Sequence, residues 1–234
     1  MFSDWTYIYL VLPAVIFAMW ASAKVNSAFQ RYSKVYSRNN ITGREAAQMV
    51  LQENGVFGVQ IERVSGNLSD HYDPRTNTIR LSDAVYNSTS TAAIGVAAHE
   101  AGHAVQYAKN YAPVKIRTAI VPITNIGSML SMPLIFLGIL LSSFGSQYAV
   151  IAYIGVACFG LCTLFQLITL PTEYNASNRA IEAISSTAIL TPEEQVGAKK
   201  VLSAAALTYV ASLAVSLMQL LRLVLLVGRN DRRD

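Results

Sequence analysis

Four long apolar stretches constrain the fold of this chain more than any other feature. They cover residues 7–23, 119–143, 147–170 and 204–227. Stretches of this length can cross the hydrocarbon core of a bilayer as helices. Charged residues make up 14% of the chain, whereas soluble proteins average about a quarter. We therefore expect a mainly α-helical, multi-pass protein of the cell membrane, with the lipid bilayer as its surroundings.

The apolar stretches divide the chain into five parts. We expect an N-terminal transmembrane anchor (1–23), a region of soluble character (24–118), a transmembrane hairpin (119–170), polar helices (171–203) and a C-terminal apolar helix with a basic tail (204–234). Prolines 122 and 133 should kink the first helix of the hairpin, which lipid-embedded helices tolerate. Pro171 should lie near the first turn of a separate short helix.

The distribution of Lys and Arg predicts the topology. Eleven of them lie between Lys24 and Arg117, and none lies within residues 1–23. The positive-inside tendency places 24–118 in the cytoplasm, and the hairpin returns 171–203 to the same side. The fourth stretch contains Arg222, so the sequence leaves open whether it spans. The net charge of +4 does not indicate nucleic-acid binding, because the basic residues flank apolar stretches.

The soluble region has signals for both helices and strands. The Thr42–Glu45 spacing is a capping box that opens a helix, and Thr191 with Glu194 forms a second one. Alternating apolar residues predict strands at 56–64 and 78–82, with a turn-rich connection over 66–77. The segment Ser88-Thr89-Ser90 is expected to supply the N-cap of a helix over about 91–109. Cys158 and Cys162 lie in an apolar stretch and are interpreted as small buried residues.

The sequence His99-Glu100-Ala101-Gly102-His103 lies on that last helix. Two histidines four residues apart share one helical face. This spacing allows both rings to bind one zinc ion. Glu100 is too close in sequence to be a comfortable third ligand, but it can take a proton from a metal-bound water.

A catalytic zinc site of this kind needs a third protein ligand. Lys109 and Gln106 exclude the long metzincin pattern, which requires His and Gly at those positions. The third ligand is therefore His71 or a carboxylate. We favour Glu173, because the hairpin crosses the membrane twice and returns this residue to the side of the histidines. His71 and the other downstream carboxylates remain alternatives.

Three segments together resemble the YugP-like bacterial membrane zinc metallopeptidases. They are the HEAGH helix, the segment from His71 to Ser82 (HYDPRTNTIRLS) and the segment from Glu173 to Ala180 (EYNASNRA). The chain also looks, more distantly, like the CAAX-prenyl and heat-shock membrane proteases. Those carry the ligand in an E-x-x-x-D segment, whose Asp position is Ser177 here. This resemblance implies that Ser177 occupies a position beside the ligands.

The resemblance implies a small α+β, gluzincin-like zinc metallopeptidase domain that hydrolyses protein or peptide substrates at the cytoplasmic membrane face. One catalytic Zn²⁺ would be held by His99, His103 and Glu173, with Glu100 as general base. The predicted strand should be a short edge strand that pairs with an extended substrate. Its residues are Thr78, Ile79, Arg80 and Leu81.

Several roles are left open by the sequence. The candidates for stabilising the oxyanion or for supporting a metal ligand are His71, Ser177, Arg179, Tyr209 and Arg222. An intramembrane site-2-type protease is disfavoured because no Asp-Gly dipeptide occurs. A non-enzymatic membrane scaffold with a structural zinc is disfavoured because such sites usually have four protein ligands. The substrate, cleavage specificity and oligomeric state are not fixed.

Overall fold

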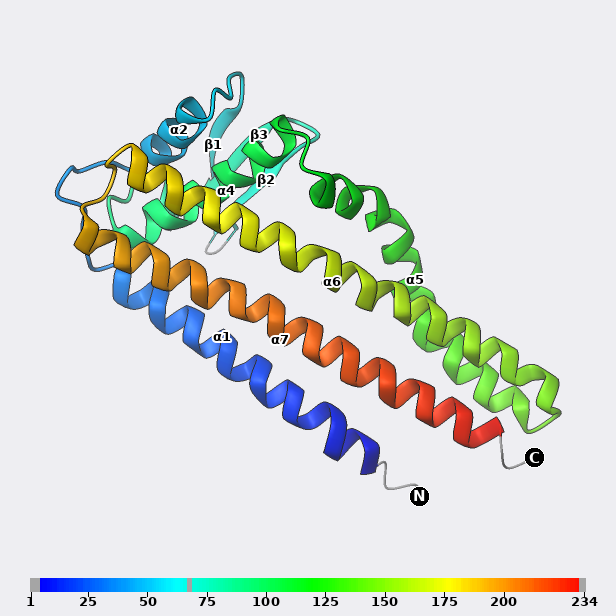
Figure 1. The fold of residues 1–234 in the computed structure, drawn as a ribbon. Helices are drawn as coiled ribbons and strands as arrows, with labels where there is room; N and C mark the ends of the chain where they lie inside the picture. The colour runs from blue at the N-terminus through cyan, green and yellow to red at the C-terminus, as the bar shows by residue number, and fades with distance from the viewer. Residues whose placement is uncertain (1–4, 67–68, 232–234) are drawn as a thin grey trace. The chain divides into compact units, whose positions relative to one another are not determined.

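The computed structural model of the chain describes residues 5–66 and 69–231. Residues 1–4 of the expected anchor, 67–68 of the expected turn and 232–234 of the expected basic tail lie outside the described residues. The elements along the chain (Figure 1) are η1 (Tyr7–Val11), α1 (Leu12–Tyr32), α2 (Gly43–Glu53), β1 (Gln60–Val64), β2 (His71–Asp73), β3 (Thr78–Ser82), α3 (Asp83–Tyr86), α4 (Thr91–Ala108), α5 (Ala112–Ser142), η2 (Ser146–Tyr148), α6 (Ala149–Ser186) and α7 (Pro192–Asp231).

Four of the described helices are long and apolar enough to cross a membrane. They span Tyr7–Tyr32, Ala112–Ser142, Ser146–Ser186 and Pro192–Arg229. Their length and composition agree with the expected membrane protein, and the mainly helical fold is confirmed. Pro122 and Pro133 lie inside α5, as expected.

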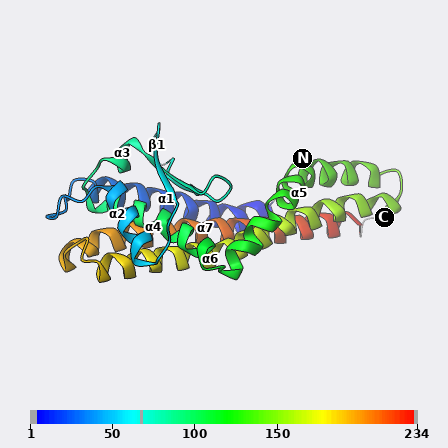
Figure 2. The ribbon, with the colours of Figure 1, turned by 90° about the horizontal axis from the view of Figure 1, so that it is seen from above.

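The chain divides into two compact units. The first comprises Met1–Trp20, Ile116–Leu170 and Tyr209–Asp234, and the second comprises Ala21–Lys115 and Pro171–Thr208. Within the first unit, α5 and α6 form a hairpin (Figure 2) and pack closely because Gly138 faces the backbone of Ala152.

The second unit has its core around α4, which begins at the expected N-cap. The Ser90 hydroxyl accepts a hydrogen bond from the amide of Ala93 at 3.2 Å. Small residues fill one stripe of the helix, and Ala97, Ala98 and Ala101 are fully buried. Their short side chains allow neighbouring helices to approach α4 closely.

Both predicted capping boxes in this unit are confirmed. Thr42 and Glu45 exchange hydrogen bonds at the start of α2. Thr191 and Glu194 do the same before α7, where the Glu194 carboxylate also accepts from the amide of Arg38 at 2.9 Å. Each box satisfies amides that a helix start would otherwise leave unpaired.

The three-stranded sheet has the order β1-β3-β2. The prediction that residues 78–81 form an edge strand is therefore wrong. The central strand β3 pairs with β1 in parallel, with Ile61 opposite Ile79, and with β2 antiparallel, with Tyr72 opposite Ile79. Strand order depends on pairing between distant segments, which the local alternation of β3 does not encode.

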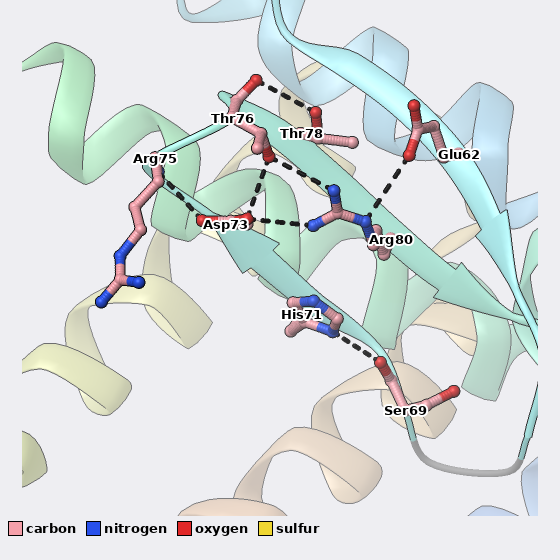
Figure 3. Close-up of polar contacts among 8 residues, drawn as sticks. All are labelled: Glu62, Ser69, His71, Asp73, Arg75, Thr76, Thr78 and Arg80. Carbon is pink, nitrogen blue, oxygen red and sulfur yellow. Dashed lines mark hydrogen bonds and ion pairs between the residues drawn. The ribbon is translucent and has the colours of Figure 1, made fainter.

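The segment expected to be rich in turns also contains the short strand β2. Figure 3 shows how its last residue, Asp73, is held. The Asp73 carboxylate accepts hydrogen bonds from the amide of Arg75 at 2.9 Å, the Thr76 hydroxyl at 3.0 Å and the Arg80 guanidinium at 3.1 Å. The bond from the Arg75 amide is the main cause that lowers the pKa of Asp73 to about 2. This exposed turn is thereby fixed against β3.

Pro171 does not begin a new helix, because α6 continues through it to Ser186. Proline lacks an amide hydrogen and so removes one backbone hydrogen bond from a helix. A long helix can continue past the missing hydrogen bond. Residues 171–186 are therefore an extension of α6. The last helix, α7, also runs without a break from Pro192 to Asp231.

Candidate metal centre

The two histidines of α4 present their rings to the same side of the helix. Their ring centroids are 4.7 Å apart and the planes are almost perpendicular, at 83°. The side chains are 14% exposed for His99 and 12% for His103. They are shielded from bulk water but retain some access for a small ligand.

Glu173 on α6 lies between these rings. Its Oε2 atom is 3.3 Å from Nε2 of His99 and 3.5 Å from Nε2 of His103. The Glu173 side chain is only 2% exposed. One ligand atom from each residue lies within 4.8 Å of the others. The structure thus brings together the three residues that the sequence singled out.

The distance from Glu173 to each histidine fits a zinc ion. Zinc binds imidazole nitrogen and carboxylate oxygen at about 2.0–2.1 Å, so the edges of its coordination tetrahedron measure about 3.3–3.4 Å. The two measured distances from Glu173 to the histidines, 3.3 and 3.5 Å, match those edges. Two imidazoles with one carboxylate are also a ligand set found in catalytic zinc sites.

Hydrogen bonds at Nδ1, the ring nitrogen that does not face Glu173, orient both histidine rings. Nδ1 of His99 lies 3.1 Å from the Ser177 hydroxyl, and Nδ1 of His103 lies 3.0 Å from Oε1 of Gln106. With Nδ1 held by such a partner, the ring would direct Nε2 to a metal bound beside Glu173. The structure thus places Ser177, identified only through the family resemblance, beside a candidate ligand.

Gln106 is the centre of a buried network. Its Nε2 donates to the Thr172 carbonyl at 2.7 Å and to Oδ1 of Asn175 at 3.0 Å. These acceptors fix the amide orientation, so Oε1 faces His103 and the ring donates from Nδ1. Arg179, another predicted residue, donates from Nε to the same Asn175 oxygen at 2.8 Å. The network ties the ligand helix α4 to α6.

In the sequence, Gln106 excludes one class of protease, and its contact with His103 and the role of Asn175 were not predicted. A signal was present for Gln106. It follows His103 by three residues, which places it on the same helical face. A polar amide on this buried face requires hydrogen-bond partners, and its exposure is 0%.

Glu100 is nearly buried, with 9% of its surface exposed. Its charge acts on His103. Burial alone lowers the pKa of His103, but the hydrogen bonds to Glu173 and Gln106 and the charges of Glu100 and Glu173 together raise it. Negative charge therefore accumulates where a cation would bind, as a metal site requires.

The other predicted residues are not among the three candidate ligands. His71 is exposed on β2, with Nδ1 2.7 Å from the Ser69 carbonyl oxygen (Figure 3), and it is not in the ligand group found among the described residues. Tyr209 belongs to the first unit, as does Arg222. The Arg222 guanidinium lies 5.4 Å from the centroid of the Tyr7 ring.

Comparison with known proteins covers almost the whole chain. Residues 7–228 match the family model described as "Putative neutral zinc metallopeptidase". The "Putative membrane protease YugP" of Bacillus subtilis (strain 168) is 44% identical over 228 residues, which is 96% of this chain and 99% of that protein. No solved structure matches the chain significantly.

Proposed function

We propose that this chain, which belongs to the family described as "Putative neutral zinc metallopeptidase", is a membrane-embedded zinc metalloendopeptidase. It would hydrolyse peptide bonds of protein substrates at the cytoplasmic face of the cell membrane. The observation that carries this proposal is the convergence of His99, His103 and Glu173. A third ligand supplied by a glutamate on a separate helix also favours a gluzincin-like arrangement.

The ligand set leaves room for catalysis. Structural zinc sites usually have four protein ligands, whereas catalytic sites have three and keep one position open. The described residues supply three ligands here. When bound, zinc supplies the Lewis acidity that activates water and polarises the scissile carbonyl.

Glu100 is the proposed general base. It accepts a proton from the attacking water and delivers it to the leaving amine, so that the amine departs neutral. Its position next to His99 on α4 keeps it at the ligand group, and its low exposure limits competition from bulk water. Ser177 and Gln106 hold the histidine rings throughout.

Strand β2 is the proposed site of substrate pairing, in place of the central strand β3. It has a neighbour on one side only in the described sheet. Its Tyr72 packs against Tyr107 of α4, with ring centroids 5.5 Å apart. Tyr107 follows His103 by one helical turn, so β2 is anchored to the helix that carries the ligands. An extended peptide can add to such an edge through its backbone.

The cytoplasmic location rests on charge and connectivity. All three ligands belong to the second unit, which includes the sequence region rich in Lys and Arg. The chain enters and leaves the hairpin between His103 and Glu173. The chain must therefore cross the membrane an even number of times between His103 and Glu173, so that these two residues lie on the same side.

A cleavage assay tests the function. The full-length protein in lipid nanodiscs should cleave casein, lose this activity with a zinc chelator and regain it when zinc is added back. Cleavage that persists unchanged in the chelator would contradict a zinc-dependent mechanism. Stoichiometric zinc without cleavage of casein or of any membrane protein offered would favour the structural-zinc scaffold.

A further inference from the structure

A cavity of about 650 Å³ lies between the end of α1 and the start of α7, within the second unit. We call it the basic groove. Its polar lining includes Lys24, Ser27, Arg31, Lys199, Lys200 and Ser203. The groove shares none of its lining residues with the metal centre, so its role is a separate question.

The charged side chains that line the groove are all positive. Its lining contains four cationic side chains and no carboxylate. Helix α1 has no Asp or Glu, and the acidic residues of α7 are Glu193 and Glu194 in its first turn and Asp231 at its far end. The ion pairs formed by the described residues do not include Arg31, Lys199 or Lys200. An anion would therefore be attracted to this groove.

The shape of the groove follows from small residues on both helices. A Cβ atom at Gly197 of α7 would stand 2.7 Å from the ring of Tyr32 on α1, so this glycine permits their close approach. Beyond that contact, Ala28 and Ala204 line the groove with short side chains. The space left between the helices can hold a group the size of a phosphate ester.

The groove borders the proposed membrane-spanning segments along the chain. Lys24 is the first charged residue after the uncharged residues 7–23 of α1 and η1. Lys200 is the last charged residue before the uncharged residues 201–221 of α7. In the proposed topology, both would lie where a helix passes from lipid tails to water, which is the depth of lipid headgroups.

We propose that the basic groove binds the headgroup of an anionic phospholipid. The guanidinium of Arg31 and the three ammonium groups would pair with the phosphodiester, and the hydroxyls of Ser27 and Ser203 would donate to its oxygens. The acyl chains would follow the uncharged parts of α1 and α7. This inference concerns lipid recognition and does not depend on peptidase activity.

Native mass spectrometry of the detergent-solubilised, full-length protein tests this proposal. We expect the wild type to retain phosphatidylglycerol at concentrations at which phosphatidylcholine dissociates. K199Q/K200Q should weaken phosphatidylglycerol binding by about thirtyfold, since each of the two cations near a membrane surface contributes about 1 kcal/mol. S203L, which fills the groove without changing charge, should weaken binding as well.

The matched control is K34Q/R75Q, which removes two exposed cations of the same unit that do not line the groove. It should bind phosphatidylglycerol like the wild type. The proposal is overturned if this control loses as much binding as K199Q/K200Q, if S203L binds normally, or if phosphatidylcholine is retained equally well. Displacement of the lipid by inorganic phosphate at constant ionic strength would assign the groove to a soluble anion instead.

Discussion

Gly102 of α4 lies so close to Ala176 of α6 that a Cβ atom at position 102 would stand 2.6 Å from the Ala176 carbonyl oxygen. This contact lies between the ligand pair on α4 and Glu173 on α6. It sets how closely the two helices that form the metal centre can approach. Any side chain at position 102 would have to separate them.

We therefore predict that Gly102→Ala weakens zinc binding and lowers the free energy of unfolding by about 1–3 kcal/mol, as overpacking does. Thermal melting and zinc content of the purified protein measure the two effects. Gly160→Ala is the matched control, because a Cβ at that helical position meets nothing within 4 Å. A Gly102→Ala protein with normal zinc and stability would show that the contact does not control the site.

Glu100→Gln tests the proposed base. The amide keeps the size of the side chain but cannot accept the proton of the attacking water. We expect peptide cleavage to fall by about 10²–10⁴-fold with zinc still bound. Glu182→Gln, which changes an exposed glutamate of α6, should retain activity. Full activity in Glu100→Gln would remove this residue from the mechanism.

Gln106→Ala tests the orientation of His103. Without the Oε1 acceptor, the ring loses the hydrogen bond that directs Nε2 to the metal. Loss of such a partner weakens metal binding by about 10–100-fold. Competition with a fluorescent zinc chelator measures the zinc affinity. Ser177→Ala removes the hydrogen-bond partner of His99 and should also weaken zinc binding. Unchanged zinc affinity in both variants would make these hydrogen bonds purely structural.

Zinc affinity should fall as the pH is lowered. The raised pKa of His103 means that, in the metal-free protein, protonation begins to compete with zinc at a higher pH than for an ordinary histidine. Protonated His103 stabilises the metal-free protein at low pH, and this contribution is lost as pH rises through its pKa. Zinc binds only the deprotonated ring. The affinity of the protein for zinc should therefore rise as the pH rises.

Below the pKa, each displaced proton lowers the apparent affinity by up to about tenfold per pH unit. Calorimetric titration with zinc between about pH 5 and pH 8, the range in which histidine titrates, measures this slope. His71→Ala should leave the profile unchanged. An affinity independent of pH over this range would mean that neither histidine binds the metal.

Much of the candidate site could be predicted because its signals are local or topological. The spacing of His99 and His103 fixes their shared helical face without any tertiary information. Glu173 followed from the need to return to the same side of the membrane. The capping boxes at Thr42 and Thr191 were likewise visible, because a helix start depends on residues three apart.

The features that were missed depend on contacts between distant segments. The central position of β3 is set by its pairing with both neighbours, and β2 exists only because His71 to Asp73 pair with it. Pro171 lies inside a continuous helix although its local preference is to begin one. The role of Gln106 requires Thr172 and Asn175, which come from another helix.

The zinc content of purified Glu173→Ala, measured by elemental analysis beside the wild type and Glu182→Ala, tests the proposed metal centre most directly. Removing the Glu173 carboxylate takes away a group whose oxygen lies within 3.5 Å of both histidine nitrogens. We predict one zinc ion per chain in the wild type and in Glu182→Ala, and little or none in Glu173→Ala. Stoichiometric zinc in Glu173→Ala would contradict the assignment of this residue as the third ligand.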